Sequence, residues 1–130
     1  MSAAKHPQKP TILVVDDNAD TRESLHYFLE ACGYGVVEAT TGRDALDKLQ
    51  SGTQPCVILL DLLMPEMDGF QFRKAQLRDP EWAAIPVIAY SALHQFAANA
   101  TRLAADAYLT KPFELNALRD LIEAHRTKLC

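Results

Sequence analysis

Short apolar runs that each end at a polar residue constrain the fold of this chain most strongly. Two of them, Thr11–Val15 and Cys56–Leu60, are too short for a buried helix and consist mainly of Val, Ile and Leu. We therefore predict two parallel strands that are buried on both faces. Asp16 and Asp17 follow the first run, and Asp61 follows the second. Because ligands bind at the carboxyl ends of strands in open α/β sheets, these carboxylates indicate a cation site.

Three further apolar runs extend the same pattern. The run Pro86–Tyr90 is followed by Ser91, and the run Ala107–Thr110 is followed by Lys111. The short run Tyr34–Glu38 predicts one more strand between the first two amphipathic segments. We therefore expect five strands, with the polar groups that follow four of them converging on one edge of the sheet.

Amphipathic segments lie between the predicted strands. Asn18 can cap a helix that ends at Gly33, and Thr41 with Asp44 three residues later resembles a capping box. The segment Asp79–Ile85 is expected to be a surface connection. Helices are predicted over about residues 18–33, 41–51, 69–78 and 93–103 and from about residue 113 onward. The apolar stripe of the third helix is weaker than the others. The residues expected to pack inward from the first and last helices are Leu25, Phe28, Leu29, Cys32, Leu115, Leu118, Leu121, Ile122 and Leu129.

Five strands that alternate with five helices specify an α/β domain with a parallel sheet and right-handed crossovers. Two doubly wound, three-layer topologies compete. A dinucleotide-binding domain would need a glycine-rich turn after the first strand, where Asp16 and Asp17 instead place two negative charges against a pyrophosphate. We therefore predict the (βα)5 flavodoxin-like fold with strand order 2-1-3-4-5, which brings both residues to Asp61 at the switch point.

Length and composition exclude several classes of protein. A chain of 130 residues suits one domain, which we place at residues 11–127, after an N-terminal extension of residues 1–10 and before a C-terminal tail of residues 128–130. The net charge of −4 argues against a nucleic-acid-binding surface. The three cysteines have neither disulfide-framework nor zinc-site spacing. No signal peptide or membrane span is indicated, so we expect a cytoplasmic protein.

The acidic residues indicate phosphoryl chemistry as well as cation binding. Two carboxylates about 4 Å apart repel by roughly 4 kcal/mol at an effective dielectric near 20, and a bound cation relieves this repulsion. Mg²⁺ fits because it takes one or two carboxylates, keeps several waters and accepts phosphate oxygens. With Lys111 as a fixed positive charge, one carboxylate can attack phosphorus in line and become an aspartyl phosphate. Asp61 is the best candidate for this nucleophile.

Taken together, the residues resemble the receiver domains of bacterial two-component response regulators, a CheY-like family. The resemblance covers about residues 11–125 and includes four motifs in the family's order and nearly its spacing. Each motif alone is weak, but the set is highly specific. The motifs are Asp16-Asp17, residues 61–69 (DLLMPEMDG), Ser91-Ala92 and residues 108–112 (YLTKP).

The resemblance implies a phosphoacceptor and a metal site. Asp61 would accept the phosphoryl group. Asp17 and Asp61 would bind Mg²⁺, for which Mn²⁺ can substitute, together with the backbone carbonyl of Leu63. Asp16 would act mainly through metal-bound water.

The resemblance also implies a set of residues that respond to the phosphoryl group. Lys111 would contact it, and Ser91 would turn its hydroxyl onto a phosphoryl oxygen once Asp61 is modified. Tyr108 would then turn inward to fill the space that Ser91 leaves. The peptide bond before Pro112 would be cis, which is plausible because cis bonds concentrate at proline.

The partners implied by the resemblance are proteins. A sensor histidine kinase or a histidine phosphotransfer protein would supply the phosphoryl group. A downstream target would bind the surface formed by the helix at 93–103, the strand at 107–110 and the last helix. Because the helix at 93–103 has few charged residues, we also consider a phosphorylation-dependent homodimer through this surface. We expect a switch that catalyses only its own phosphorylation and dephosphorylation.

Two other functions stay open. A metal-dependent phosphohydrolase could use an Asp61 intermediate, although Leu63 stands where aspartate-nucleophile phosphatases usually place a general acid. A pseudo-receiver that is never phosphorylated would not need the full set of acidic residues, Ser91 and Lys111.

Overall fold

The computed structural model describes residues 10–62, 69–91 and 104–127. Five parallel strands form one sheet in the order β2-β1-β3-β4-β5. The predicted α/β fold and strand order are therefore confirmed. The strands are β1 (Thr11–Val15), β2 (Gly35–Ala39), β3 (Val57–Asp61), β4 (Val87–Ser91) and β5 (Ala107–Thr110).

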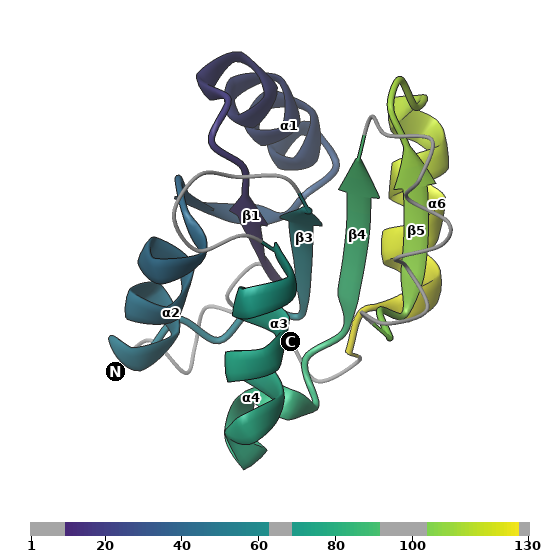
Figure 1. Cartoon of the computed structure of the whole chain (residues 1–130). Helices are drawn as coiled ribbons and strands as arrows, with labels where there is room; N and C mark the ends of the chain where they lie inside the picture. Colours follow the sequence, from purple (N-terminus) through teal and green to yellow (C-terminus); the bar gives the residue numbers. More distant parts are fainter. Residues whose placement is uncertain (1–9, 63–68, 92–103, 128–130) are drawn as a thin grey trace, which may run out of the picture.

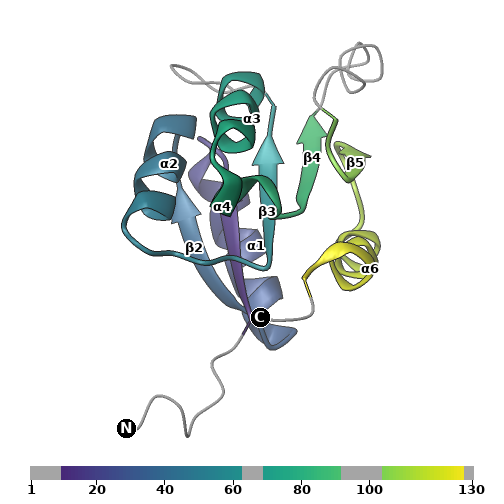
Figure 2. The same cartoon turned by 90° about the horizontal axis from the view of Figure 1, so that it is seen from below.

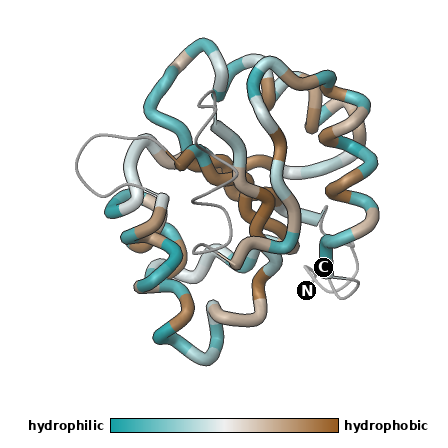
Figure 3. Tube along the Cα trace, turned by 45° about the vertical axis from the view of Figure 1, so that its right-hand side comes forward, coloured by the Kyte–Doolittle hydropathy of each residue, from teal (hydrophilic) through white to brown (hydrophobic). Residues whose placement is uncertain are grey.

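Helices cover both faces of this sheet (Figures 1 and 2). On one face, α1 and α6 bury apolar residues against β1, β3 and β4. On the other face, α2 and α3 pack against the alternate residues of the same strands. Figure 3 shows hydrophobic colour concentrated along the central strands, as expected for strands buried on both faces. The helices are α1 (Ala19–Ala31), α2 (Gly42–Gln50), α3 (Gly69–Arg78), α4 (Pro80–Ala83) and α6 (Leu115–His125).

The predicted helix caps of α1 and α2 are present. The Asn18 side chain accepts a hydrogen bond from the Thr21 backbone N–H at 2.9 Å. The Thr41 hydroxyl accepts one from the Asp44 N–H at 3.0 Å. The Asp44 carboxylate in turn accepts from the Thr40 N–H at 3.1 Å, one residue before the position of a standard capping box. Local sequence therefore decides where these two helices begin.

Two strands extend one residue further than the apolar runs predict. Asp61 and Ser91 are the last residues of β3 and β4, and not the first residues after them, because Asp61 pairs with Tyr90 and Ser91 pairs with Thr110 in the sheet. Both polar side chains therefore leave from regular strand backbone. Their direction is set by the sheet and not by a turn.

The segment predicted as a surface connection contains the single-turn helix α4. Asp79 caps it by accepting a hydrogen bond from the Glu81 N–H at 2.8 Å, and Pro80 occupies its first turn. This pair is a common helix start, since proline lacks the N–H that the first turn leaves unpaired.

Two residues predicted to pack inward do not. Cys32 is exposed at the end of α1, and Leu115 at the start of α6 is 37% exposed. Each lies at an end of its helix, one residue past the end of α1 and at the first residue of α6. Leu25, Leu29, Leu118 and Ile122 are buried as predicted.

Several predictions fall outside the described residues. They are the helix at 93–103, Leu129, residues 1–9 of the proposed N-terminal extension and the whole proposed C-terminal tail. Among the helices that the structure describes, none has both the length and the apolar character needed to cross a bilayer.

Candidate functional site

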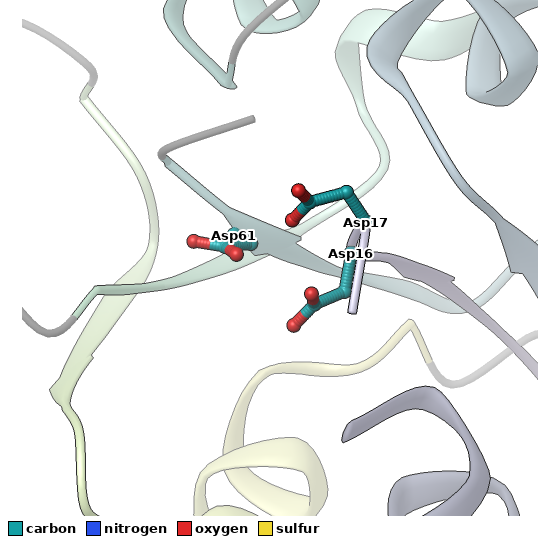
Figure 4. A group of neighbouring side chains, drawn as sticks. All are labelled: Asp16, Asp17 and Asp61. Atoms are coloured by element: carbon teal, nitrogen blue, oxygen red, sulfur yellow. The ribbon is translucent and has the colours of Figure 1, made fainter. Parts of the chain in front are cut away.

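Three carboxylates meet at the carboxyl ends of β1 and β3. One oxygen from each of Asp16, Asp17 and Asp61 lies within 4.8 Å of the others. Figure 4 shows the three side chains gathered at this edge. The sheet register explains the meeting, because Val15 pairs with Leu60 and the residues that follow them are therefore neighbours. Asp16 is fully buried and Asp61 is 6% exposed, whereas Asp17 is open to solvent.

Asp16 is held by hydrogen bonds from both sides. Its Oδ1 accepts from the Asn18 backbone N–H at 2.8 Å, and its Oδ2 accepts from the Tyr90 hydroxyl at 2.7 Å. Its backbone carbonyl accepts from the Arg22 guanidinium, also at 2.8 Å. A buried carboxylate needs such donors, because an unpaired buried charge costs several kcal/mol. The orientation of Asp16 is therefore fixed by its surroundings.

Lys111 brings a positive charge to the same edge from the end of β5. Its Nζ lies 3.7 Å from Asp16 Oδ2 and 3.7 Å from Asp61 Oδ2. Both distances exceed those of a direct charged hydrogen bond. One ammonium group between these two carboxylates offsets only part of the negative charge of the three acids. The peptide bond between Lys111 and Pro112 is cis.

Tyr90 is a site residue that the sequence did not reveal. It is fully buried, and its ring lies 5.0 Å from Lys111 Nζ and 5.5 Å from the Phe113 ring. Burial raises the pKa of the Tyr90 hydroxyl well above its usual value of 10.0, and the Asp16 carboxylate raises it further. The hydroxyl is therefore a donor at all ordinary pH values. A tyrosine in an otherwise aliphatic strand was the available signal, since a buried phenol needs a partner.

Ser91 and Tyr108 lie on the two strands beyond β3. Ser91 is 2% exposed at the end of β4, on the same edge of the sheet as Asp61. Tyr108 is half-buried in β5, and its hydroxyl accepts a hydrogen bond from the Ala105 backbone N–H at 2.9 Å. In this structure the phenol is thus tied to the segment that leads into its own strand.

Gly69, the first residue of α3, packs closely against the backbone of Asp61 and Leu62 at the end of β3. A Cβ atom at this position would lie 2.8 Å from Leu62 Cα and 3.0 Å from the Asp61 carbonyl oxygen. The start of α3 therefore approaches the end of β3 too closely for any side chain. Leu63, whose carbonyl was predicted as a metal ligand, lies outside the described residues.

The donor set fits a hard divalent cation. It offers carboxylate oxygens only, two of them on residues that are nearly or fully buried, and it leaves one acid exposed. Mg²⁺ and Ca²⁺ prefer such oxygen ligands, and Mg²⁺ needs only one or two carboxylates. Fold and site together define a doubly wound α/β domain with a cluster of three carboxylates at its topological switch point.

Comparison with known proteins agrees with this assignment. The chain belongs to the response regulator receiver domain family, whose model matches residues 12–123. This confirms the family resemblance inferred from the four motifs.

Individual relatives cover most of the chain. It is 36% identical over 118 residues to a probable transcriptional regulator ycf27 of Guillardia theta, covering 89% of this chain and 45% of that protein. It is 36% identical over 115 residues to PilH of Pseudomonas aeruginosa, covering 87% of this chain and 94% of PilH. The crystal structure of the response regulator TrrA from Thermotoga maritima, in complex with Mg²⁺-BeF, matches with a TM-score of 0.79 and 29% identity over 88% of this chain and 97% of TrrA.

The chain spans about half the length of ycf27 and of several other regulators that it matches. By contrast, it spans nearly all of PilH. The shared region is therefore the receiver domain.

Proposed function

We propose that this chain is a signalling switch that accepts a phosphoryl group on Asp61 with the help of Mg²⁺. The observation that carries the proposal is the clustering of three carboxylates within 4.8 Å at the strand ends, with Lys111 Nζ 3.7 Å from Asp61 Oδ2. Membership of the receiver family supports the same conclusion.

Asp61 suits the role of nucleophile better than its acidic neighbours. Both oxygens of Asp16 already accept hydrogen bonds, which fits a residue of fixed orientation. Asp17 is exposed at the rim of the site. Asp61 is nearly buried, and its Oδ2 lies 3.7 Å from Lys111 Nζ, a cation that can hold phosphoryl oxygens.

Asp17 and Asp61 would hold the metal with the Leu63 carbonyl, and Asp16 would act through metal-bound water. When bound, Mg²⁺ supplies positive charge to the phosphoryl oxygens, and Mn²⁺ would substitute for it. The Mg²⁺-BeF complex of TrrA supports Mg²⁺ as the metal.

The reaction is an in-line displacement at phosphorus. An Asp61 carboxylate oxygen forms the new O–P bond while the N–P bond of a phosphohistidine breaks, and the departing imidazole nitrogen takes a proton from solvent. Lys111 stabilises charge on the transferred group. The donor would be a sensor histidine kinase or a histidine phosphotransfer protein. Hydrolysis of the resulting acyl phosphate by water resets the switch.

The response to phosphorylation would pass through Ser91 and Tyr108. The Ser91 hydroxyl would turn onto a phosphoryl oxygen, and Tyr108 would leave its hydrogen bond with Ala105 and turn inward. The surface formed by residues 93–103, β5 and α6 would then bind a downstream protein or a second copy of the chain. We propose protein partners and not nucleic acid because the net charge is −4. The proposed location is the cytoplasm.

The test is intact-mass analysis after incubation with acetyl phosphate, with and without Mg²⁺. We expect one Mg²⁺-dependent phosphate on the wild type and none on Asp61→Asn. Asp47→Asn, which changes an exposed acid of α2, is the matched control and should still accept phosphate. A folded wild type that binds Mg²⁺ but takes no phosphate would indicate a pseudo-receiver. Sustained hydrolysis of added phosphate esters would instead indicate a phosphohydrolase.

A further inference from the structure

We propose that Tyr90 is a positioning residue of the metal site. Its hydroxyl holds the Asp16 carboxylate in the orientation that cation binding requires and keeps that carboxylate from pairing directly with Lys111. The inference rests on the proposed function in one respect, which is that Asp16 serves the bound cation.

The contact depends on the length of the tyrosine side chain. Tyr90 is on β4 and Asp16 follows β1, and β3 lies between these two strands in the sheet. Strands are spaced about 4.8 Å apart, so the two side chains and the hydrogen bond between them must together bridge roughly 10 Å between the backbones of β1 and β4. The long Tyr90 side chain supplies most of this reach, and its hydroxyl donates to Asp16 Oδ2 at 2.7 Å. The hydroxyl of a serine or threonine on β4 would be too short to reach it.

The same carboxylate oxygen has a second possible partner. Asp16 Oδ2 is the atom that lies 3.7 Å from Lys111 Nζ, and Lys111 is equally far from Asp61 Oδ2. The Tyr90 hydroxyl already occupies one hydrogen-bonding position of Asp16 Oδ2 at 2.7 Å, while the ammonium group lies 3.7 Å from each of the two acids. The Tyr90 ring also lies 5.0 Å from the Lys111 ammonium group, and this cation–π contact favours the present position of the ammonium group.

Removal of the Tyr90 hydroxyl would change which group contacts Asp16 Oδ2. Asp16 Oδ2 would lose its donor inside a fully buried environment and would take Lys111 instead, at about 2.8 Å. An ammonium group bound directly to a carboxylate competes with a cation for that carboxylate. It would also be less available to a phosphoryl group. Partners that orient metal-binding groups in this way typically change metal affinity by about 10-fold or more.

The test is calorimetric titration of Mg²⁺ into the full chain without any phosphodonor. Tyr90→Phe removes the hydroxyl and keeps the ring with its packing on Phe113. Tyr34→Phe is the matched control, because Tyr34 is also buried and donates to a carboxylate, that of Glu123, at the opposite end of the strands. We expect Tyr90→Phe to weaken Mg²⁺ binding about tenfold and Tyr34→Phe to leave it unchanged.

A double-mutant cycle separates positioning from general damage to the core. If Tyr90 acts through Asp16, adding Tyr90→Phe to Asp16→Asn should change Mg²⁺ affinity less than twofold. Unchanged Mg²⁺ affinity in Tyr90→Phe, or an equal loss in the Asp16→Asn background, would overturn the inference. So would a wild type that does not bind Mg²⁺.

The result is independent of phosphorylation. A wild type that binds Mg²⁺ but accepts no phosphate refutes the proposed switch, while the titrations still decide the role of Tyr90. A wild type that is phosphorylated on Asp61, with normal Mg²⁺ binding in Tyr90→Phe, refutes this inference alone.

Discussion

Two buried polar clusters in this domain differ in how far hydrogen bonds within the protein satisfy their polar groups. The acidic cluster, Asp16, Asp17 and Asp61, gathers three carboxylates around one ammonium group at the ends of the strands. The arginine cluster, Arg73 and Gln76 of α3, gathers hydrogen-bond donors and acceptors beneath α4 and the start of the segment before β5. Both are shielded from solvent, apart from the exposed Asp17.

The arginine cluster is matched donor to acceptor. Arg73 donates to the Gln76 side chain and to the Ala104 carbonyl, both at 2.8 Å. The Gln76 amide donates to the carbonyls of Trp82 and Ile85 at 2.8 and 3.0 Å. Burial lowers the pKa of Arg73, and the nearby charge of Asp106 opposes this effect. The cluster connects α3 to the α4 segment and to the residues before β5, and these hydrogen bonds are made without any ligand.

Burial of polar groups therefore does not by itself identify a binding site. The arginine cluster is as buried as the acidic one but has its hydrogen-bonding groups paired within the protein. The acidic cluster combines burial with like charges that the protein leaves only partly offset. This imbalance is what a cation and a phosphoryl group can complete.

The largest effect on stability is expected from the arginine cluster. Arg73→Met keeps much of the side-chain volume but leaves the Gln76 oxygen and the Ala104 carbonyl without this donor. At about 1–3 kcal/mol for each unsatisfied group, we expect a loss of about 3 kcal/mol in the free energy of unfolding, measured in urea. Lys74→Met, at the exposed neighbouring position, should change it by less than about 0.5 kcal/mol. Equal stability of both variants would show that the cluster is dispensable.

The next largest effect is expected from Mg²⁺, which should raise the unfolding free energy through the acidic cluster and not through the arginine cluster. At a free concentration 100 times the dissociation constant, the wild type should gain about 2.7 kcal/mol in unfolding free energy. Arg73→Met should gain the same amount, because its site is intact. Asp61→Asn should gain much less. Urea unfolding with and without Mg²⁺ measures these increments, and a reduced gain in Arg73→Met would mean that the two clusters are coupled.

A smaller change in unfolding free energy is expected when the acidic cluster is altered in the absence of metal. Asp61→Asn removes one of three like charges at little change in volume, so we expect the metal-free variant to be about 1 kcal/mol more stable than the wild type. Asp47→Asn is the exposed control. If Asp61→Asn instead destabilises the metal-free protein, the acidic cluster is as well balanced as the arginine cluster, and the contrast between them fails.

The smallest change in unfolding free energy is expected from the half-exposed ion pairs around His26. His26 contacts Glu38 at 2.7 Å and Glu30 at 3.2 Å, and Arg22 pairs with Glu38 at 3.1 Å. The hydrogen bond to Glu38 raises the pKa of His26 above its ordinary 6.5, against a partial desolvation that lowers it.

The sign of the pH dependence follows from that shift. The protonated imidazole is favoured in the folded state, so its contribution is complete below about pH 6.5 and is lost as the pH rises through the higher folded pKa. Urea unfolding at a series of pH values should show a fall of less than about 1 kcal/mol that is absent in His26→Gln. A rise in stability over the same range would contradict the assignment.

The sequence was sufficient for the sheet and for the acidic cluster because both follow from local pattern. Short apolar runs give strand positions, and a residue that follows a parallel strand must lie at the common edge. The same reasoning missed α4, since a single turn has no periodicity. It also placed Cys32 and Leu115 inside, because helical periodicity gives the direction of a side chain and not the extent of the surface opposite it.

Polar contacts between residues far apart in the chain could not be predicted from the sequence. The Tyr90 hydroxyl meets Asp16 across 74 positions, and Arg73 meets the Ala104 carbonyl across 31. The weak apolar stripe predicted for α3 has the same origin, because two of its buried residues are Arg73 and Gln76. The roles of Leu63 and of the residues at 93–103 stay predictions.

The alternation of side chains along β4 has a consequence for protein engineering. Ile88 and Tyr90 face the layer of α1 and α6, while Val87 and Ala89 face the layer of α2 and α3. Tyr90 and Ser91 therefore belong to opposite sides of one strand. Substitutions at each can be tuned separately, but inserting or deleting one residue within β4 would exchange their sides and disable both. A graft of this site into another scaffold must carry the two as a pair in fixed register.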